Sequence, residues 1–266
     1  MREITVELVR ATEPGKALQS PHDPDAGYSH KGVGYHVQIA ETCRADGPRF
    51  VIDFAVHSAS VSDHGQAEAC IERLEARGLK PDVVNADAGY TSGSSLIACD
   101  NLGVDLRAPV RWGSLRKDVL LRTEWERDPD SKLLTRCPAG HAVVRHGLRT
   151  IEGEQRQCAY MSGGDCRECP LQRRCLARPG NTRGTGQFFI EDTPAIQRRD
   201  RRLGEQQRPD WRKKYAIRSG AESTNSELKR GHKFGHLRVR RAHRVRLAVT
   251  TKLIACNIKR WLRAVR

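Results

Sequence analysis

Four reactive side chains recur at regular spacing near the C-terminal end of the sequence: Tyr215, Arg218, Glu222 and Lys229. At about 100° per residue, these positions fall within roughly 60° of one another on a helix. One helix face would then carry a phenol, a guanidinium, a carboxylate and an ammonium group. A carboxylate between basic neighbours could hold a metal ion next to phosphate groups. The alternative is a solvated face with ion pairs.

A second candidate carboxylate belongs to Asp87. Residues 82–86 are predicted to form a short buried strand, and Asp87 follows it directly, two residues before Gly89. Ligand sites of open α/β sheets gather beyond the C-terminal ends of the strands. Asp87 is therefore a candidate metal ligand, and the alternative is a turn or helix cap.

Four cysteines form a pattern typical of a zinc site. Cys137 opens a Cys-Pro-x-Gly turn, and Cys166, Cys169 and Cys175 follow in a Cys-x2-Cys-x5-Cys run. Four thiols suit tetrahedral Zn²⁺, which would staple a segment with little apolar content. The other interpretation is a set of free thiols buried in an irregular insertion. Alternative candidates for one ligand position are Cys158, His141 and His146. The remaining thiols are predicted to lie in the core, at Cys43, Cys70, Cys99 and Cys256.

The overall composition favours a polyanionic partner. The 266 residues carry a formal net charge of +15, and from Arg198 onward there are 22 Lys and Arg against 5 Asp and Glu. Such asymmetry indicates nucleic acid, whereas the alternatives are a solvated basic face or an acidic protein partner. No stretch approaches the about 18 consecutive apolar residues of a membrane span, and the first residues lack the apolar core of a signal peptide. We expect a cytoplasmic protein, in which nine cysteines argue for metal binding or buried thiols.

Alternating strand and helix signals predict an α/β fold. Strands are expected at 4–9, 34–40, 49–56, 82–86 and 104–110, and helices at 63–78, 94–102, 198–207, 211–230 and 244–265. The chain is expected to divide into an entry segment (1–30), the first part of the core (31–112), a Cys-rich insertion with the candidate zinc ligands (113–193) and a helical segment that completes the core (194–266). Asp63 is the expected N-cap of the first helix.

The segment after Glu222 is a candidate DNA-binding surface. It holds Lys229, Arg230 and Lys233 within a basic run that extends to Arg241. Dense positive charge supplies sequence-independent binding to a phosphate backbone. The alternative is a solvated face that binds nothing.

The order and spacing of Tyr215, Arg218, Glu222 and Lys229 resemble the Tyr-Arg-Glu-Lys motif of bacterial insertion-sequence DDE transposases. The run that begins at Asp87 resembles the element that carries the second acidic residue of that family. The stretches 23–35 and 257–260 also resemble the family. The likeness extends from about residue 20 to the end of the chain.

This resemblance implies an RNase H-like fold, in which a mixed sheet is flanked by helices. It also implies two Mg²⁺ ions that cleave and join DNA strands at transposon ends, with Asp87 and Glu222 as metal ligands. Arg218 and Lys229 would contact phosphates near the transposon end, and Tyr215 would help to hold the end DNA or the helix of Glu222 in place. The partner would be double-stranded DNA, both transposon ends and target, and the resemblance also implies a homodimer on DNA.

The sequence departs from the family pattern at its start. The first acidic residue of the family lies on the first strand, upstream of the stretch 23–35, but residues 1–19 contain no Asp. We therefore expect a chain without the first catalytic Asp, whether a truncated product, a pseudogene remnant or half of a split frame. The candidate replacements are Asp23, Asp25, Asp53 and Asp63. The competing hypotheses are a non-catalytic, zinc-containing DNA-binding remnant and another RNase H-like nuclease.

Overall fold

The structure is a computed structural model that describes residues 20–30, 32–43, 47–113, 118–180 and 186–266. The chain forms two compact units. The first unit comprises Met1–Asp63, Ala69–Lys80 and Ile217–Arg266, and the second comprises His64–Glu68 and Pro81–Ala216. Each unit is described by itself.

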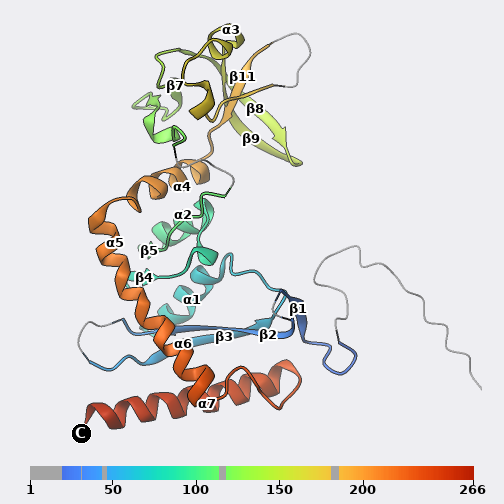
Figure 1. The fold of residues 1–266 in the computed structure, drawn as a ribbon, viewed down its shortest axis with the longest axis vertical. Helices are drawn as coiled ribbons and strands as arrows, with labels where there is room; N and C mark the ends of the chain where they lie inside the picture. The colour runs from blue at the N-terminus through green and yellow to red at the C-terminus, as the bar shows by residue number, and fades with distance from the viewer. Residues whose placement is uncertain (1–19, 31, 44–46, 114–117, 181–185) are drawn as a thin grey trace, which may run out of the picture. The chain divides into compact units, whose positions relative to one another are not determined.

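The first unit is built on an antiparallel sheet in the order β1-β2-β3 (Figure 1). Its strands are β1 (Gly27–Ser29), β2 (Gly32–Glu41) and β3 (Val51–Ser58). The helices α6 (Ser219–Gly231) and α7 (Ala242–Ala264) complete the unit, together with most of α1 (Gln66–Glu75). Leu228 of α6 and Val249 of α7 are fully buried with Val51 of β3 in one apolar cluster. These contacts hold α6, the helix that carries Glu222.

Polar side chains fix both ends of α7. The carboxylates of Asp23 and Asp25 accept from the backbone N–H groups of Arg241 and Ala242 at 3.1 and 2.9 Å, at the start of the helix. Near the other end, the Asn257 amide donates to the carbonyl of Val51 and accepts from its N–H at 2.8 and 2.9 Å. The stretches around residues 23 and 257 therefore have a structural role.

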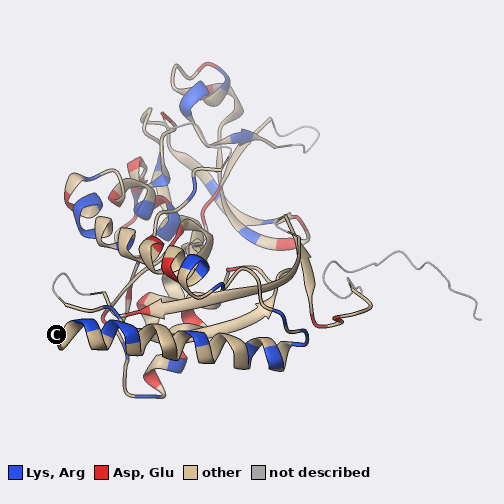
Figure 2. Cartoon of the chain, turned by 60° about the horizontal axis from the view of Figure 1, so that its bottom comes forward, with Lys and Arg blue, Asp and Glu red and all other residues tan. Residues whose placement is uncertain are grey.

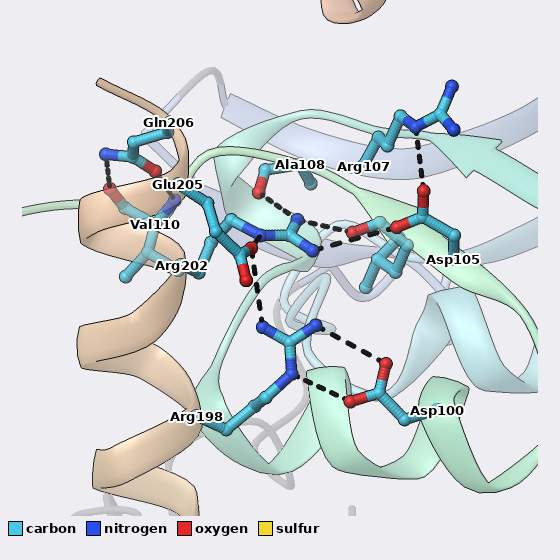
Figure 3. A network of polar contacts seen from close by, with 10 residues as sticks. Asp100, Asp105, Arg107, Ala108, Val110, Arg198, Arg202, Glu205 and Gln206 are labelled. Atoms are coloured by element: carbon cyan, nitrogen blue, oxygen red, sulfur yellow. Dashed lines mark hydrogen bonds and ion pairs between the residues drawn. The ribbon is translucent and has the colours of Figure 1, made fainter. Parts of the chain in front are cut away.

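The second unit contains a parallel pair, β4 (Val83–Asn85) and β5 (Asp105–Arg107), with the helices α2 (Gly93–Asn101), α4 (Pro194–Glu205) and α5 (Pro209–Tyr215). α2 and α4 approach closely, because a Cβ on Gly93 would lie 1.8 Å from the Ala195 carbonyl oxygen. Arg202 of α4 is buried and donates to the carbonyls of Leu106 and Ala108 at 2.6 and 3.1 Å (Figure 3). This guanidinium ties α4 to the end of β5.

The Cys-rich segment forms small sheets within the second unit. β6 (Glu126–Arg127) pairs with β7 (Leu134–Arg136), and a four-stranded antiparallel sheet has the order β10-β11-β9-β8. Its strands are β8 (Val143–Ile151), β9 (Glu154–Met161), β10 (Arg178–Pro179) and β11 (Phe188–Glu191). The short helix α3 (Gly163–Arg167) follows β9, and Ser162 caps it.

The expected α/β class and most of the expected elements are confirmed. Among the described residues, the parallel and antiparallel strands form separate sheets. The strand expected at 4–9 lies outside the described residues. None of the helices in the described ranges combines the length and the apolar character that a bilayer crossing requires.

The expectation of one continuous helix over 211–230 is wrong. A 3-10 turn, Ala216–Arg218, separates α5 from α6. Ser219 and Gly220, which follow the turn, are weak helix formers. A Cβ on Gly220 would overlap the guanidinium of Arg49, so a larger residue there would have to displace that flexible side chain. Tyr215 and Glu222 therefore lie on two different helices, α5 and α6, and the calculated common helix face does not exist.

Two smaller expectations also need correction. Asp63 lies three residues before α1, and its carboxylate accepts from the Gln38 amide at 3.1 Å instead of standing next to the helix as its N-cap. Cys43 is exposed beyond the end of β2, because the strand stops two residues earlier, whereas Cys99 and Cys256 are buried as expected.

Candidate functional site

Asp87 lies at the C-terminal end of β4, where the strand passes into a 3-10 turn, Ala88–Tyr90. Its side chain is exposed, and one carboxylate oxygen accepts from the N–H of Gly89 at 2.7 Å. The residue is thus a turn cap, and it also presents a carboxylate to solvent at the strand end. The capping bond limits rotation of the side chain, which suits a group that must hold a fixed position.

Tyr215 holds the residue that precedes Asp87. Its hydroxyl donates to the main-chain carbonyl of Ala86 at 2.9 Å, and its ring stacks on Trp211 with centroids 4.9 Å apart. The N–H of Ala86 in turn donates to the Arg107 carbonyl at 3.1 Å. Tyr215, expected as a DNA contact, is placed as a support for the strand end.

Glu222 lies in the first turn of α6 with 70% of its side chain exposed. Arg218, one turn earlier, donates to it at 3.1 Å. Lys229 follows seven residues later, two turns along the helix, and is therefore on the same face. The carboxylate stands between two cations on an exposed helix face.

The two candidate metal ligands belong to different units. Asp87 and Tyr215 are part of the second unit, whereas Arg218, Glu222 and Lys229 are part of the first. Each set is therefore a local arrangement: a capped carboxylate at a strand end, and a carboxylate between cations on a helix.

The Asp residues considered as replacements for a third ligand hold structural contacts. The buried carboxylate of Asp53 pairs with Arg73 and Arg77, both at 2.7 Å. Asp23 accepts from the Tyr35 hydroxyl at 2.7 Å, and Asp23 and Asp25 cap α7. Burial and the Asp23 carboxylate raise the pKa of Tyr35, which keeps the phenol protonated as the donor.

The expected DNA-binding cations are exposed. Lys229 and Arg230 lie in the last turns of α6, and Lys233 follows with a φ of 51°, in the left-handed region. In Figure 2, blue Lys and Arg positions recur along α7, whose sequence contains no Asp or Glu. The helices α6 and α7 of the first unit therefore both contribute basic side chains.

The four cysteines of the predicted zinc pattern converge. Cys137, Cys166, Cys169 and Cys175 line one small cavity of the second unit, and His141 lines it as well. Four separate stretches of chain meet there: the turn after β7, the helix α3, the loop after it and the segment before β10.

The side chains of the alternative ligands lie elsewhere, except that of His141. Cys158 packs with Tyr160 and Phe189, while its neighbours on β9, Ala159 and Met161, belong to the cluster that adjoins the cavity. Successive residues of a strand point to opposite faces, so Cys158 faces away from the other thiols. A ring nitrogen of His146 lies 2.8 Å from the carbonyl of Leu134.

The thiols affect one another electrostatically. Burial, together with the nearby Cys175, Cys137 and Cys169, raises the pKa of Cys166 to about 11. Burial likewise raises the pKa of Cys175, but backbone N–H groups directed at its sulfur oppose this, and that of Ala177 lies at 3.4 Å. None of the nine cysteines, all of which lie in the described ranges, forms a disulfide bond.

A group that sequence inspection missed lies in the first unit. Potential ligand atoms of Glu227, His232 and Cys256 all lie within 4.8 Å of one another. Arg260 donates twice to one Glu227 oxygen, at 2.9 and 3.1 Å, and Lys259 lies 3.5 Å from the other. Because these cations already neutralise the carboxylate, the group is best described as an ion-pair network. The three residues follow no ligand spacing, so the sequence carried no signal for it.

Exposed carboxylates can hold metal ions that act on phosphate groups, and clustered basic side chains are the electrostatic signature of nucleic-acid binding. Comparison with protein-family models identifies the family. Residues 8–150 match a model described as a transposase DDE domain, and residues 136–262 match a second model with the same description. The chain therefore belongs to the DDE transposases, enzymes that cleave DNA and transfer strands. Comparisons with curated proteins and with solved structures gave no match.

Proposed function

We propose that this chain is the catalytic domain of an insertion-sequence transposase, with Asp87 and Glu222 as ligands of divalent metal ions. The observation that carries the proposal is the position of these two carboxylates. Asp87 is exposed and oriented at the end of a strand, and Glu222 is exposed between Arg218 and Lys229.

The donor atoms fit the metal that the family typically uses. Carboxylate oxygens are hard ligands, which suit Mg²⁺. Bound Mg²⁺ would polarise phosphate oxygens and lower the pKa of water or of a 3′-hydroxyl for strand cleavage and strand transfer. The protein's own part is to hold the two carboxylates and to bind the DNA backbone through Arg218, Lys229 and the basic segment that follows.

We further propose that the chain is catalytically incomplete when it acts alone. The Asp residues that could replace the first acidic residue are held in ion pairs, helix caps or side-chain hydrogen bonds. Releasing Asp53, for example, would leave Arg73 and Arg77 without their buried partner. Two carboxylates hold a metal pair weakly, so DNA cleavage should be weak or absent.

The second candidate function is DNA binding without cleavage. The engaged Asp residues and the exposed cations of α6 and α7 favour it. The two functions share the basic surface and differ only in the chemistry at Asp87 and Glu222.

Plasmid nicking with Mg²⁺ or Mn²⁺ tests both candidates. We expect slow, metal-dependent nicking that Asp87→Asn and Glu222→Gln abolish, while the control Glu72→Gln, an exposed carboxylate of α1, leaves it unchanged. DNA binding without any nicking would support the second function instead. Rapid nicking that Asp25→Asn or Asp53→Asn abolished in a folded protein would contradict the proposed incompleteness.

A further inference from the structure

The Cys-rich part of the second unit has a small apolar core, and cysteine side chains lie at its edge. Its buried residues include Trp125, Leu134 and Met161, and three of the thiols pack against them: Cys137, Cys166 and Cys175. Within the described residues, this core has six buried members in all. Small segments of this kind usually need a disulfide or a metal ion to remain folded.

The local backbone is shaped to present the sulfur atoms. Cys137 begins a tight turn in which the Gly140 N–H donates to the Cys137 carbonyl at 2.8 Å, and Gly140 has a φ of 89° that favours glycine. The N–H of Cys137 donates back to the His141 carbonyl at 2.9 Å. The turn thus fixes the direction of the Cys137 side chain toward the cavity that it lines.

The other three thiols are presented in a similar way. Ser162 caps α3, whose last turn carries Cys166, and the Cys169 carbonyl accepts from the N–H of Gln172 at 3.1 Å. The N–H of Ala177 donates to the sulfur of Cys175 at 3.4 Å. Backbone N–H groups that donate to sulfur favour the thiolate, which is the form that binds metal.

We infer that Cys137, Cys166, Cys169 and Cys175 bind one structural Zn²⁺ ion in the second unit. The site is closed by four protein ligands, as in structural zinc sites, and leaves no coordination position for substrate. Its assignment rests on the shared cavity and the turns, and it is independent of the proposed function of Asp87 and Glu222. β7 and α3, which lead to the first two ligands, are labelled in Figure 1.

His141 is the one competing ligand in the cavity. Its ring nitrogen lies 3.8 Å from a carboxylate oxygen of Asp165. We assign this imidazole to the surroundings of the site, where a hydrogen bond from its ring N–H to the Asp165 carboxylate would hold the ring. The fourth ligand is then a thiol, and the site is of the four-cysteine type.

Metal analysis of the full chain, purified under reducing conditions, tests the inference. We expect about one zinc per chain, and after exchange with Co²⁺ the visible absorption of a tetrahedral thiolate site. Serine variants of each of the four ligands should lose the metal at least tenfold more readily to a chelator. Cys158→Ser in the same sheet and Cys43→Ser on the surface are matched controls that should keep it. Because the cobalt spectrum needs no variant, poor folding of a serine variant does not remove the test.

Specific results would overturn the inference. These are a folded, reduced chain without zinc or a cobalt spectrum, a disulfide between two of the four cysteines in the purified protein, or zinc that Cys158→Ser removes. His141→Ala is expected to retain zinc. Loss of zinc in that variant, together with retention in one of the four serine variants, would contradict the four-thiol assignment.

Discussion

The hydroxyl of Tyr215 donates to the main-chain carbonyl of Ala86, the residue directly before Asp87, at 2.9 Å. The motif tyrosine is thus bonded to the strand that presents the candidate catalytic carboxylate. The N–H of Ala86 is held from the other side by the Arg107 carbonyl. We interpret Tyr215 as a positioning residue for Asp87.

Tyr215→Phe should loosen the end of β4 without unfolding the second unit. The variant keeps the stack on Trp211 and loses one hydrogen bond, which contributes about 1 kcal/mol. Backbone amides of residues 86–90 should therefore exchange hydrogen about fivefold faster. Tyr28→Phe, at an exposed ring of the first unit, is the control. Unchanged exchange at residues 86–90 would contradict the positioning role.

Asn257 is predicted to anchor α7 to β3. Its amide completes both backbone hydrogen bonds of Val51, at the point where the register between β2 and β3 shifts. Asn257→Ala should lower the free energy of unfolding by about 1–3 kcal/mol, because both backbone groups lose their partner. Urea unfolding measures this change. Thr251→Ala removes only a hydroxyl that is hydrogen-bonded within α7, and should lower the unfolding free energy much less. An equal decrease in both variants would contradict the role of Asn257 as an anchor.

The sequence predicted elements and clusters better than the roles of single residues. Hydrophobic periodicity located β2 and α1, because burial of one face leaves a repeat in the chain. The break between α5 and α6 was missed, because the weak helix formers Ser219 and Gly220 that follow it leave only a faint local signal. The convergence of the four cysteines was anticipated because metal ligation constrains spacing.

The roles of residues that resemble family positions became clear only from their contacts in the structure. Asp23, Asp25 and Asn257 resemble family positions, and their side chains cap or anchor α7. No local pattern distinguishes a capping carboxylate from a metal ligand, because both are short acidic side chains next to a turn. Asp87 also caps a turn, but its carboxylate is exposed, unlike those of Asp23 and Asp53, so burial has to be considered together with the contacts.

The buried pair of Arg122 and Asp200 is predicted to dominate the polar stability of the second unit. Asp200 is fully buried and accepts from the Arg122 guanidinium at 2.9 Å. Arg122→Met should cost about 3–5 kcal/mol, because a buried carboxylate loses its main partner. Arg199 also contacts Asp200, at 3.1 Å, but is partly exposed, so Arg199→Met should cost about 1 kcal/mol or less. Equal costs by urea unfolding would contradict this ranking.

Glu227 should make the first unit sensitive to acid. Burial opposes its charge, yet the hydrogen bonds and charge of Arg260 outweigh burial and lower its pKa. A lowered folded-state pKa adds stability above the unfolded value of about 4.3, and this stability is lost as the pH falls through the folded value. The difference in unfolding free energy between wild type and Glu227→Gln should thus be largest near neutral pH and shrink toward pH about 3. A difference in unfolding free energy that grows on acidification would contradict a lowered pKa of Glu227 in the folded protein.

The exposed cations after Glu222 should set the salt dependence of DNA binding. Each phosphate contact contributes about 0.9 to the slope of log affinity against log salt concentration. Replacing Lys229, Arg230 and Lys233 by Gln should therefore reduce that slope by about 2–3 on duplexes of unrelated sequence. Lys80→Gln is the matched control, because the Lys80 ammonium is already paired with Glu75 at 2.8 Å. Fluorescence anisotropy at several salt concentrations measures the slope. A slope that is unchanged in the triple variant would remove this segment from the DNA-binding surface, whereas a change confined to one DNA sequence would indicate contacts with bases instead of phosphates.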